Sequence, residues 1–242
     1  YVLHGDFTME DGAISYNTTS KNGGGVYVDG GNFTMNDGTI SQNIITLDGG
    51  GAYVVGGGSF EMNGGSIMSN TTNGGNGGGV YLSGGDFIIN SGAVSDNEAY
   101  KNGGALYIVG GGSLTMASGT ISQNSTSTGD GGGIYINGGN ITVTDGSLIE
   151  NVSGANGGGV CLLDGTVEMG NGRIANNKSS VYGGGVYVYN SVIDSPQTVN
   201  FSGGSLVGNS SKYGGGVCVN GNISLIIGNV ENAYMHQFAD EE

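Results

Sequence analysis

The sequence contains no tryptophan, one proline, two cysteines and only five basic residues among 242. With so little proline and no glycine at every third position, the chain cannot form a collagen triple helix. Five Lys and Arg against 20 Asp and Glu give a net charge of −15, so we expect binding neither to nucleic acid nor to an anionic membrane surface. No apolar run reaches the roughly 18 residues of a transmembrane helix, so we also expect no membrane insertion.

Glycine is abundant instead, with 55 residues. Such a composition is typical of low-complexity segments, but apolar residues make up 36% of this chain and recur at fixed positions. Blocks of three small residues begin at positions 23, 49, 77, 103, 131, 157, 183 and 214, which lie 26, 28, 26, 28, 26, 26 and 31 residues apart. A period in this range indicates a solenoid, in which each repeat stacks on its neighbours.

Each repeat holds three short runs with strand-like alternation, and none is long enough for a helix. In one repeat they are Val26–Val28, Phe33–Met35 and Gly38–Ser41, separated by turn residues. This pattern predicts an all-β fold, a right-handed parallel β-helix (β-solenoid) with three short strands per coil and about nine coils of about 26 residues. We expect the β-helix over residues 1–227 and a cap or tail over 228–242. Because Tyr1 aligns with Tyr27, we expect the chain to be part of a longer array.

The alternation predicts that Val26, Val28, Phe33, Met35 and Ile40 and their equivalents point into the core, where like side chains stack on like. A uniform glycine position should have positive φ: Gly12, Gly38, Gly65, Gly92, Gly119, Gly146, Gly172 and Gly204. One asparagine position is invariant in the repeats, and we predict that it forms an internal hydrogen-bonded ladder: Asn17, Asn43, Asn70, Asn97, Asn124, Asn151, Asn177 and Asn209.

The repeat motif resembles that of the chlamydial polymorphic membrane proteins and related adhesin-like β-helix proteins, which carry Gly-Gly-Ala-Ile/Leu/Val and Phe-x-x-Asn motifs. Gly103–Leu106 matches the first motif literally, and Ile14 to Asn17 or Leu206 to Asn209 matches the second with Ile or Leu for Phe. The resemblance covers residues 1–219. It implies a cell-surface passenger domain, often adhesive, and an extracellular location.

Enzymatic chemistry is not indicated. The two histidines lie near opposite ends of the sequence, and no outward strand position carries carboxylates in adjacent repeats. We call the set of equivalent positions in successive repeats a rank. A rank of mostly Asn and Asp precedes the glycine blocks, at positions 22, 48, 76, 102, 130 and 156. Such side chains cap turns or, alternatively, bind calcium. We therefore predict no enzyme and no cofactor, with calcium as the alternative. Cys161 and Cys218 share one rank with Tyr187 between them, so we expect two free, outward-facing thiols.

Two candidate contact surfaces remain. A tyrosine rank should point outward because its strand neighbours point inward, and exposed aromatic stripes mark interaction surfaces: Tyr27, Tyr53, Tyr81, Tyr107, Tyr135 and Tyr187. Stacked rings would equally serve to stabilise the strand face. The second candidate is an enlarged turn after Val188 that should protrude as a loop: Tyr189, Val192, Ile193, Asp194 and Pro196.

These observations predict a non-enzymatic, surface-displayed, adhesin-like β-helix segment that acts as a rigid spacer and contact surface, with a protein or glycan as its ligand. One alternative is a structural subunit that stacks head to tail on copies of itself, because open coil ends can template further strand pairing. A second alternative is a carbohydrate-binding or carbohydrate-active β-helix.

Overall fold

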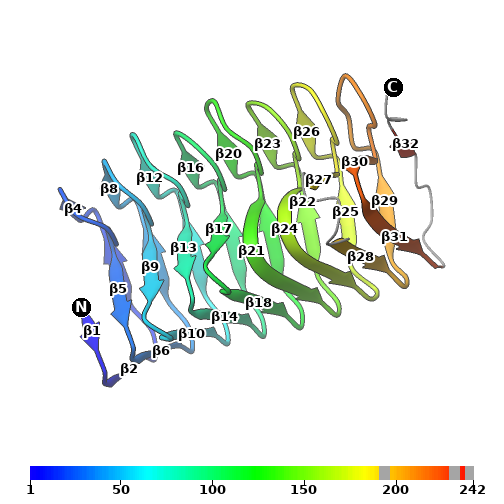
Figure 1. Ribbon diagram of the computed structural model, residues 1–242. Coiled ribbons are helices and arrows are strands. Elements are labelled where there is room, and N and C mark those ends of the chain that lie inside the picture. Colours follow the sequence, from blue (N-terminus) through cyan, green and yellow to red (C-terminus); the bar gives the residue numbers. More distant parts are fainter. Residues whose placement is uncertain (191–196, 229–234, 238–242) are drawn as a thin grey trace.

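The fold is a β-solenoid, as the repeat predicts. The computed structural model describes residues 1–190, 197–228 and 235–237, and these contain strands and no helix. The pairings between strands are parallel, as in Phe60 with Phe33 of the preceding coil and Phe87 of the next. Figure 1 shows the coils stacked along one axis, with the first coil at one end and the last at the other.

A single coil shows how the sequence runs become strands. β5 (Val26–Asp29), β6 (Asn32–Met35) and β7 (Thr39–Ser41) correspond to the three predicted runs, and β8 (Ile44–Ile45) adds a short strand after the ladder asparagine. Strands of the β5 and β6 type belong to one continuous sheet, which we call sheet A; those of the β7 type form sheet B and those of the β8 type form sheet C. The coil therefore has three sheets.

Sheet A has two strand positions in each coil. The first position is occupied by β1 (Val2–Leu3), β5, β9 (Ala52–Val55), β13 (Val80–Ser83), β17 (Leu106–Val109), β27 (Val186–Asn190), β30 (Val217–Gly221) and β32 (Met235–Gln237). The second position is occupied by β2 (Asp6–Met9), β6, β10 (Ser59–Met62), β14 (Asp86–Ile89), β18 (Ser113–Met116), β28 (Gln197–Phe201) and β31 (Ile223–Ile227). Two long strands span both positions, β21 (Ile134–Val143) and β24 (Val160–Met169).

The other two sheets are made of shorter strands. Sheet B contains β3 (Ala13–Ser15), β7, β11 (Ser66–Met68), β15 (Ala93–Ser95), β19 (Thr120–Ser122), β22 (Ser147–Ile149), β25 (Arg173–Ala175) and β29 (Ser205–Val207). Sheet C contains β4 (Thr18–Thr19), β8, β12 (Thr71–Thr72), β16 (Glu98–Ala99), β20 (Ser125–Thr126), β23 (Val152–Ser153) and β26 (Lys178–Ser179).

The number of coils is close to the predicted nine. Sheet B contains eight strands in the described part of the chain, one per coil. Sheet A extends beyond it, because β32 pairs with β30 through Val217 and Met235. A backbone strand at residues 235–237 therefore continues the stack within the segment expected to be a cap or tail.

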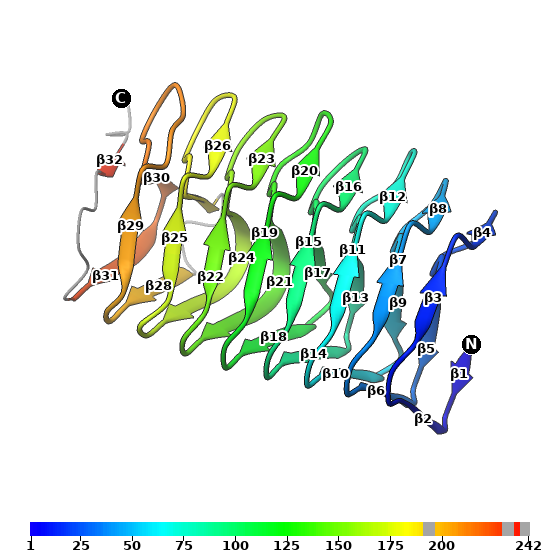
Figure 2. The same ribbon diagram turned by 180° about the vertical axis from the view of Figure 1, so that it is seen from behind.

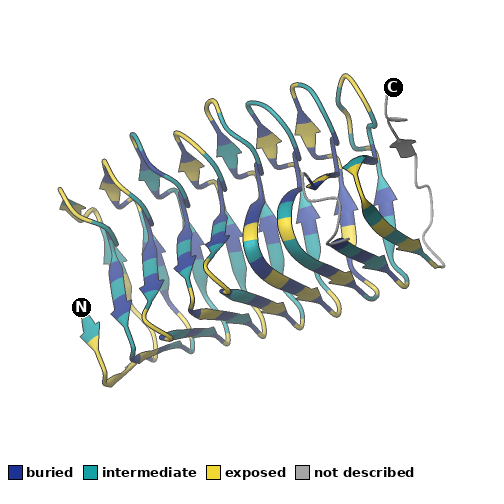
Figure 3. Ribbon diagram, viewed as in Figure 1, coloured by how far each residue is buried: buried dark blue, intermediate teal, exposed yellow. Residues whose placement is uncertain are grey.

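The strands of sheet C and the loops that follow them project from one edge of the stack (Figures 1 and 2). We call this projection the loop ridge; in each coil it comprises the residues between the ladder asparagine and the first glycine of the next block. Much of the exposed surface lies on its loops, whereas the inward faces of the sheets are buried (Figure 3). Every length variation between neighbouring coils falls either in this ridge or in the turn between the two strand positions of sheet A.

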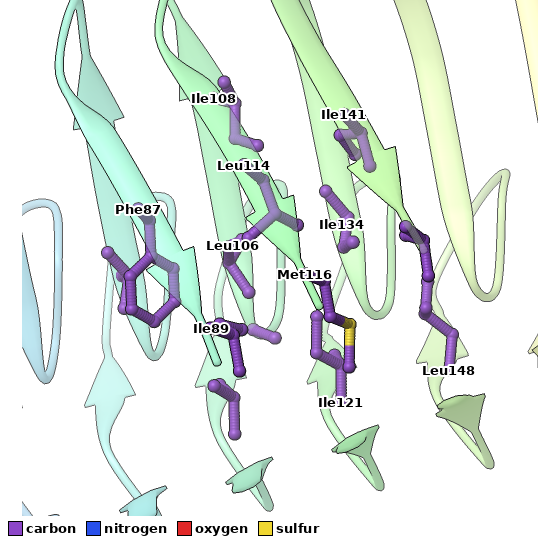
Figure 4. Packing of buried hydrophobic residues seen from close by; sticks show 14 of the residues in the cluster. Phe87, Ile89, Leu106, Ile108, Leu114, Met116, Ile121, Ile134, Ile141 and Leu148 are labelled. Atoms are coloured by element: carbon purple, nitrogen blue, oxygen red, sulfur yellow. The ribbon is translucent and has the colours of Figure 1, made fainter. Parts of the chain in front are cut away.

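The core is one continuous column of apolar side chains. Val26, Val28, Phe33, Met35 and Ile40 are all buried, which confirms the inward assignment. The register places equivalent residues directly above one another, so that Phe33 contacts Phe60 with ring centroids 4.8 Å apart. Figure 4 shows this packing in the middle of the stack, where Leu114, Met116 and Ile121 fill one coil.

The asparagine ladder is present and uses every hydrogen-bonding group of its side chains. The Nδ2 group of Asn43 donates to Oδ1 of Asn70 in the next coil at 2.9 Å and to the carbonyl of Ile14 in the preceding coil at 3.1 Å. Oδ1 of Asn43 accepts the backbone N–H and the Nδ2 of Asn17, both at 2.9 Å. The same bonds recur along the stack to Asn209. The buried amides are therefore paired, and the stack avoids the free-energy cost of burying an unpaired polar group.

The residue before each ladder asparagine adopts a left-handed backbone conformation. Except for Gly208 these are not glycines, and Gln42, for example, has a φ of 55°. A left-handed residue costs roughly 1–2 kcal/mol, which the ladder bonds that follow it offset. The uniform glycine position was predicted to have positive φ, and six of its eight members do, including Gly38 at 95°. At Gly146 and Gly172 the prediction is wrong. Glycine is still required there by close packing, because an added Cβ would lie within 3 Å of side-chain atoms of Met116 or Val143.

Each glycine of the three-residue block has its own structural reason. The first has positive φ, as at Gly131 with 66°. The second packs against sheet C of the coil that the block begins, so that a Cβ on Gly132 would lie 2.5 Å from the carbonyl carbon of Val152. The third faces the ladder, where a Cβ on Gly133 would lie 2.6 Å from the oxygen of Gly159 and 3.3 Å from Nδ2 of Asn151. Glycine therefore lets the returning chain lie against the base of the loop ridge.

We predict that Ile121→Asp destabilises the protein far more than Thr115→Asp. Ile121 is fully buried in the column, where an unpaired carboxylate costs several kcal/mol, whereas Thr115 is exposed on the outer face of sheet A. Thermal unfolding followed by circular dichroism measures both variants. Equal melting temperatures would show that the inside–outside assignment is wrong.

We predict that Gly132→Ala lowers stability more than Gly111→Ala. Gly111 has a φ of 81° but no atom within 4 Å of an added Cβ, so its substitution tests backbone conformation alone, at a cost of roughly 1–2 kcal/mol. Gly132 does not have positive φ, and its substitution tests only the close contact with sheet C. Chemical denaturation compares the two, and a smaller loss at Gly132 would contradict the close-packing explanation.

Candidate functional site: the tyrosine stripe and the loop ridge

The predicted tyrosine rank forms a continuous stack on the outer face of sheet A. Ring centroids from Tyr27 to Tyr53, Tyr81 and Tyr107 lie 5.1, 4.7 and 5.0 Å apart, and the angles between ring planes are at most 29°. Tyr135 continues the stack, with its ring 4.9 Å from Tyr107 and nearly parallel to it. We call Tyr27 to Tyr135 the tyrosine stripe.

Burial divides the rank into two parts. The first four rings are only partly buried: Tyr27, Tyr53, Tyr81 and Tyr107. The relative solvent exposure of Tyr135 and Tyr187 is only 6% and 7%. All six rings lie outside the core column, but the expected exposure is wrong for Tyr135 and Tyr187. Tyr135 and Tyr187 are covered because they pack with Cys161, Cys218 and neighbouring side chains into a small apolar cluster outside the coil.

Stacking decides which atoms of the stripe a ligand can reach. Each ring face is covered by the ring of the next coil, so edges and phenol hydroxyls point outward. Burial raises the pKa of Tyr53, Tyr81 and Tyr107, to which the Asp48 charge adds. Burial likewise raises the pKa of Tyr187 to about 12, so these phenols remain protonated hydrogen-bond donors at neutral pH.

A hollow lies between the stripe and the loop ridge in the first coils. It measures about 540 Å³ and is lined by Tyr1 and Tyr27 on one side and by Lys21, Asn22 and Leu47 of the ridge on the other. This volume falls within the roughly 300–1,000 Å³ of small-molecule sites.

The two cysteines are free, as predicted, but they are not accessible. Tyr187 lies between them in register, pairing with Cys161 on one side and Cys218 on the other. Both side chains are fully buried, because Tyr135, Tyr187 and Tyr182 cover them. Burial raises the pKa of Cys161 well above its usual range and that of Cys218 to about 11, so both remain unreactive thiols.

Tyr182 is the contact residue that the sequence analysis did not select. It occupies the Asx rank in front of a glycine block, and its ring stacks 5.6 Å from Tyr187 and 5.3 Å from Tyr213 of the next coil. The signal was visible in the sequence, because tyrosine replaces Asn or Asp at this rank only in the last two repeats. The substitution widens the aromatic surface of the ridge at that end of the stack.

The Asx rank caps the ridge loops with its side-chain oxygens. Oδ1 of Asp48 accepts the backbone N–H of Asn76 at 2.7 Å and its Nδ2 at 3.0 Å, and Asp130 accepts the same pair from Asn156 at 2.9 and 2.8 Å. These contacts give the rank the capping role that was weighed against calcium. In the described part of the chain, no three His, Cys, Asp or Glu side chains gather as metal ligands.

The enlarged turn is only partly visible. Tyr189 is exposed at its start, and Val192, Ile193, Asp194 and Pro196 lie outside the described residues. The flanking Asn190 and Gln197 are buried, and Nδ2 of Asn190 donates to the carbonyl of Asn222 at 2.9 Å. The base of the candidate loop is thus attached to the neighbouring coil.

Among the described residues, no helix is long and apolar enough to cross a membrane.

We predict that Asp130→Asn raises the melting temperature near pH 7. Burial raises the pKa of Asp130 in the folded state, although the hydrogen bonds from Asn156 lower it in part. Ionisation of this carboxyl therefore reduces the free energy of unfolding as the pH rises above the unfolded-state pKa. The new amide would retain the acceptor and could donate to Asn102, as Asn156 donates to Asp130.

The gain should shrink near about pH 3, where the wild-type carboxyl is protonated in both states. The exposed Asp145→Asn is the matched control for the loss of one negative charge. An equal gain from both variants at both pH values would contradict a burial cost at Asp130.

Comparison of the chain with protein-family models, with curated proteins and with solved structures found no match in any of the three. The interpretation of function therefore rests on the geometry described above.

Proposed function

We propose that this chain is a non-enzymatic, surface-displayed, adhesin-like β-solenoid that acts as a rigid spacer and as a contact surface for a protein or glycan ligand. The observation that carries the proposal is the tyrosine stripe. Its four partly exposed rings, Tyr27, Tyr53, Tyr81 and Tyr107, stand in line over four consecutive coils. Tyrosine is enriched at interfaces because it supplies a large rigid surface together with one polar group.

The geometry of the stripe favours contact through ring edges and hydroxyls. Since the ring faces are occupied by one another, a sugar ring or a cation cannot stack on Tyr53 or Tyr81 from outside. Protonated phenols spaced one coil apart can donate hydrogen bonds to a row of acceptors, such as peptide carbonyls or glycan oxygens. The hollow beside Tyr27 provides a recess at the edge of this surface.

The spacer part of the proposal is supported by the repetition of the same contacts in every coil. The ladder and the apolar column run through the stack without interruption from Asn17 to Asn209. In such an array each coil is stabilised by its neighbours, so length is added without a change of cross-section. A stack of this kind holds a contact surface away from its point of attachment.

We predict that the double substitution Tyr53→Thr and Tyr81→Thr reduces binding to an immobilised array of extracellular proteins and glycans at least about tenfold, the effect of losing two interfacial hydrogen bonds and their contact area. Threonine preserves strand propensity at both positions. The matched control is Thr34→Ser with Thr115→Ser, which alters the other outward rank of sheet A.

Melting curves of the same variants separate contact from stabilisation. If the wild-type protein bound nothing on the array while the tyrosine variants only melted earlier, the stripe would be a stabilising stack and the contact proposal would fail. Light scattering across a concentration series identifies the alternative in which copies of the chain bind one another.

A further inference from the structure

A second outward rank of sheet A changes its chemistry halfway along the stack. This rank follows the second strand position, and its described members are Glu10, Asn36, Asn63, Asn90, Ala117, Thr144, Gly170, Ser202 and Gly228. In the first coils its amides form a chain of hydrogen bonds: Nδ2 of Asn63 donates to Oδ1 of Asn36 at 3.0 Å, and Nδ2 of Asn90 donates to Oδ1 of Asn63 at 2.8 Å. Asn90 also donates to Oε1 of Glu61 at 2.9 Å, so that carboxylate is already partnered.

The chain of amides stops where the side chains become shorter. Gly170 has no side chain in the position of Asn90, and a hollow of about 220 Å³ opens there. Thr144 and Ser202 lie beside the gap, and Thr142, Glu168 and Asn200 form the adjacent row, in register with one another. Glu168 occupies the same rank as Glu61, but Ser202 of the next coil stands where Asn90 stands beside Glu61, so no amide donates to Glu168.

Three polar side chains around this hollow, Thr142, Glu168 and Asn200, have no hydrogen-bond partner among the described residues. Thr142 and Glu168 are exposed and Asn200 is half-buried. Ser202 donates to the carbonyl of Met169 at 3.2 Å. One carboxylate, one amide and the Thr142 and Thr144 hydroxyls thus surround a single recess on a rigid sheet.

We propose that this recess binds one sugar unit of a neutral glycan. The two oxygens of the Glu168 carboxylate can accept hydrogen bonds from two adjacent sugar hydroxyls, which is the bidentate, charge-assisted arrangement. Asn200 can donate and accept beside it, and the threonine hydroxyls can do the same. The volume is below the roughly 300 Å³ of ordinary ligand pockets, which suits a single ring rather than a longer chain.

Charge discriminates among sugars, and the number of carboxylates argues against a metal. An acidic sugar would meet Glu168 and the net charge of −15, so neutral units are preferred. Calcium takes six to eight oxygen ligands, usually with several carboxylates, and Glu168 is the only carboxylate lining the hollow. The site lies on a different rank from the tyrosine stripe and does not depend on it.

The test is ligand-observed NMR with neutral mono- and oligosaccharides at millimolar concentration, after a glycan array has ranked them. Binding should be roughly 10- to 100-fold weaker for Glu168→Gln, because a charge-assisted bond is lost, and weaker also for Thr142→Val. Glu61→Gln and Thr115→Val are matched controls on the same rank and should bind as the wild type does.

Two outcomes would overturn the proposal. One is that no neutral glycan gives a signal that depends on Glu168. The other is that calcium chloride alone perturbs the Glu168 carboxylate resonance while sugars do not. Substitution of Tyr53 and Tyr81 should leave this binding unchanged, so failure here and failure of the tyrosine stripe are distinguishable.

Discussion

The hydrogen bonds of the asparagine ladder are the interaction on which the rest of the coil depends. They hold the turn between sheets B and C, where the preceding residue is left-handed and no regular strand satisfies the backbone. A shorter or longer side chain could not reach both the next amide and the preceding carbonyl, as Nδ2 of Asn70 reaches Asn97 and Ile40. The fixed turn sets the register of Ile40 in the core and of the short strand that begins the loop ridge. Loss of the Asn70 amide would leave the backbone N–H and one Nδ2 hydrogen of Asn43, and the carbonyl of Ile40, without their partners.

The glycine blocks impose the second constraint, which acts on the ridge. Because Gly132 approaches the backbone of Val152 so closely, the chain can leave the coil, form a loop and return alongside the next coil's sheet C without opening a gap. Ala105 stands at the third glycine position of one block and is fully buried, which shows that this position has slightly more room than the second. Ridge loops can therefore differ in length and side chains while the strands that follow them remain in register.

The sequence was sufficient to predict what repetition encodes. Alternation placed Val28, Phe33 and Ile40 inside, and invariance identified the ladder, because each depends on contacts that recur in every coil. It could not predict the left-handed residues, since Gln42 and Asp96 carry no glycine signal, and their conformation is imposed by the ladder bond that follows. Nor could it predict how far Tyr135 or Cys161 is buried, because that depends on the ridge and on neighbouring coils rather than on the strand alone.

Function in such a molecule is expected where a rank is interrupted rather than where it is regular. Inward ranks and the ladder tolerate few residue types, so they are nearly uniform and carry little information about a ligand. Outward ranks are held in position by the same frame but are free to vary. Tyr182 in an Asx rank and Gly170 in an amide rank are two such interruptions, and each alters the surface, by adding an aromatic cluster or by opening a recess beside an unpartnered carboxylate. A rigid, repetitive scaffold thus makes a single substitution sufficient to create a local site, because the surrounding backbone does not relax to fill it.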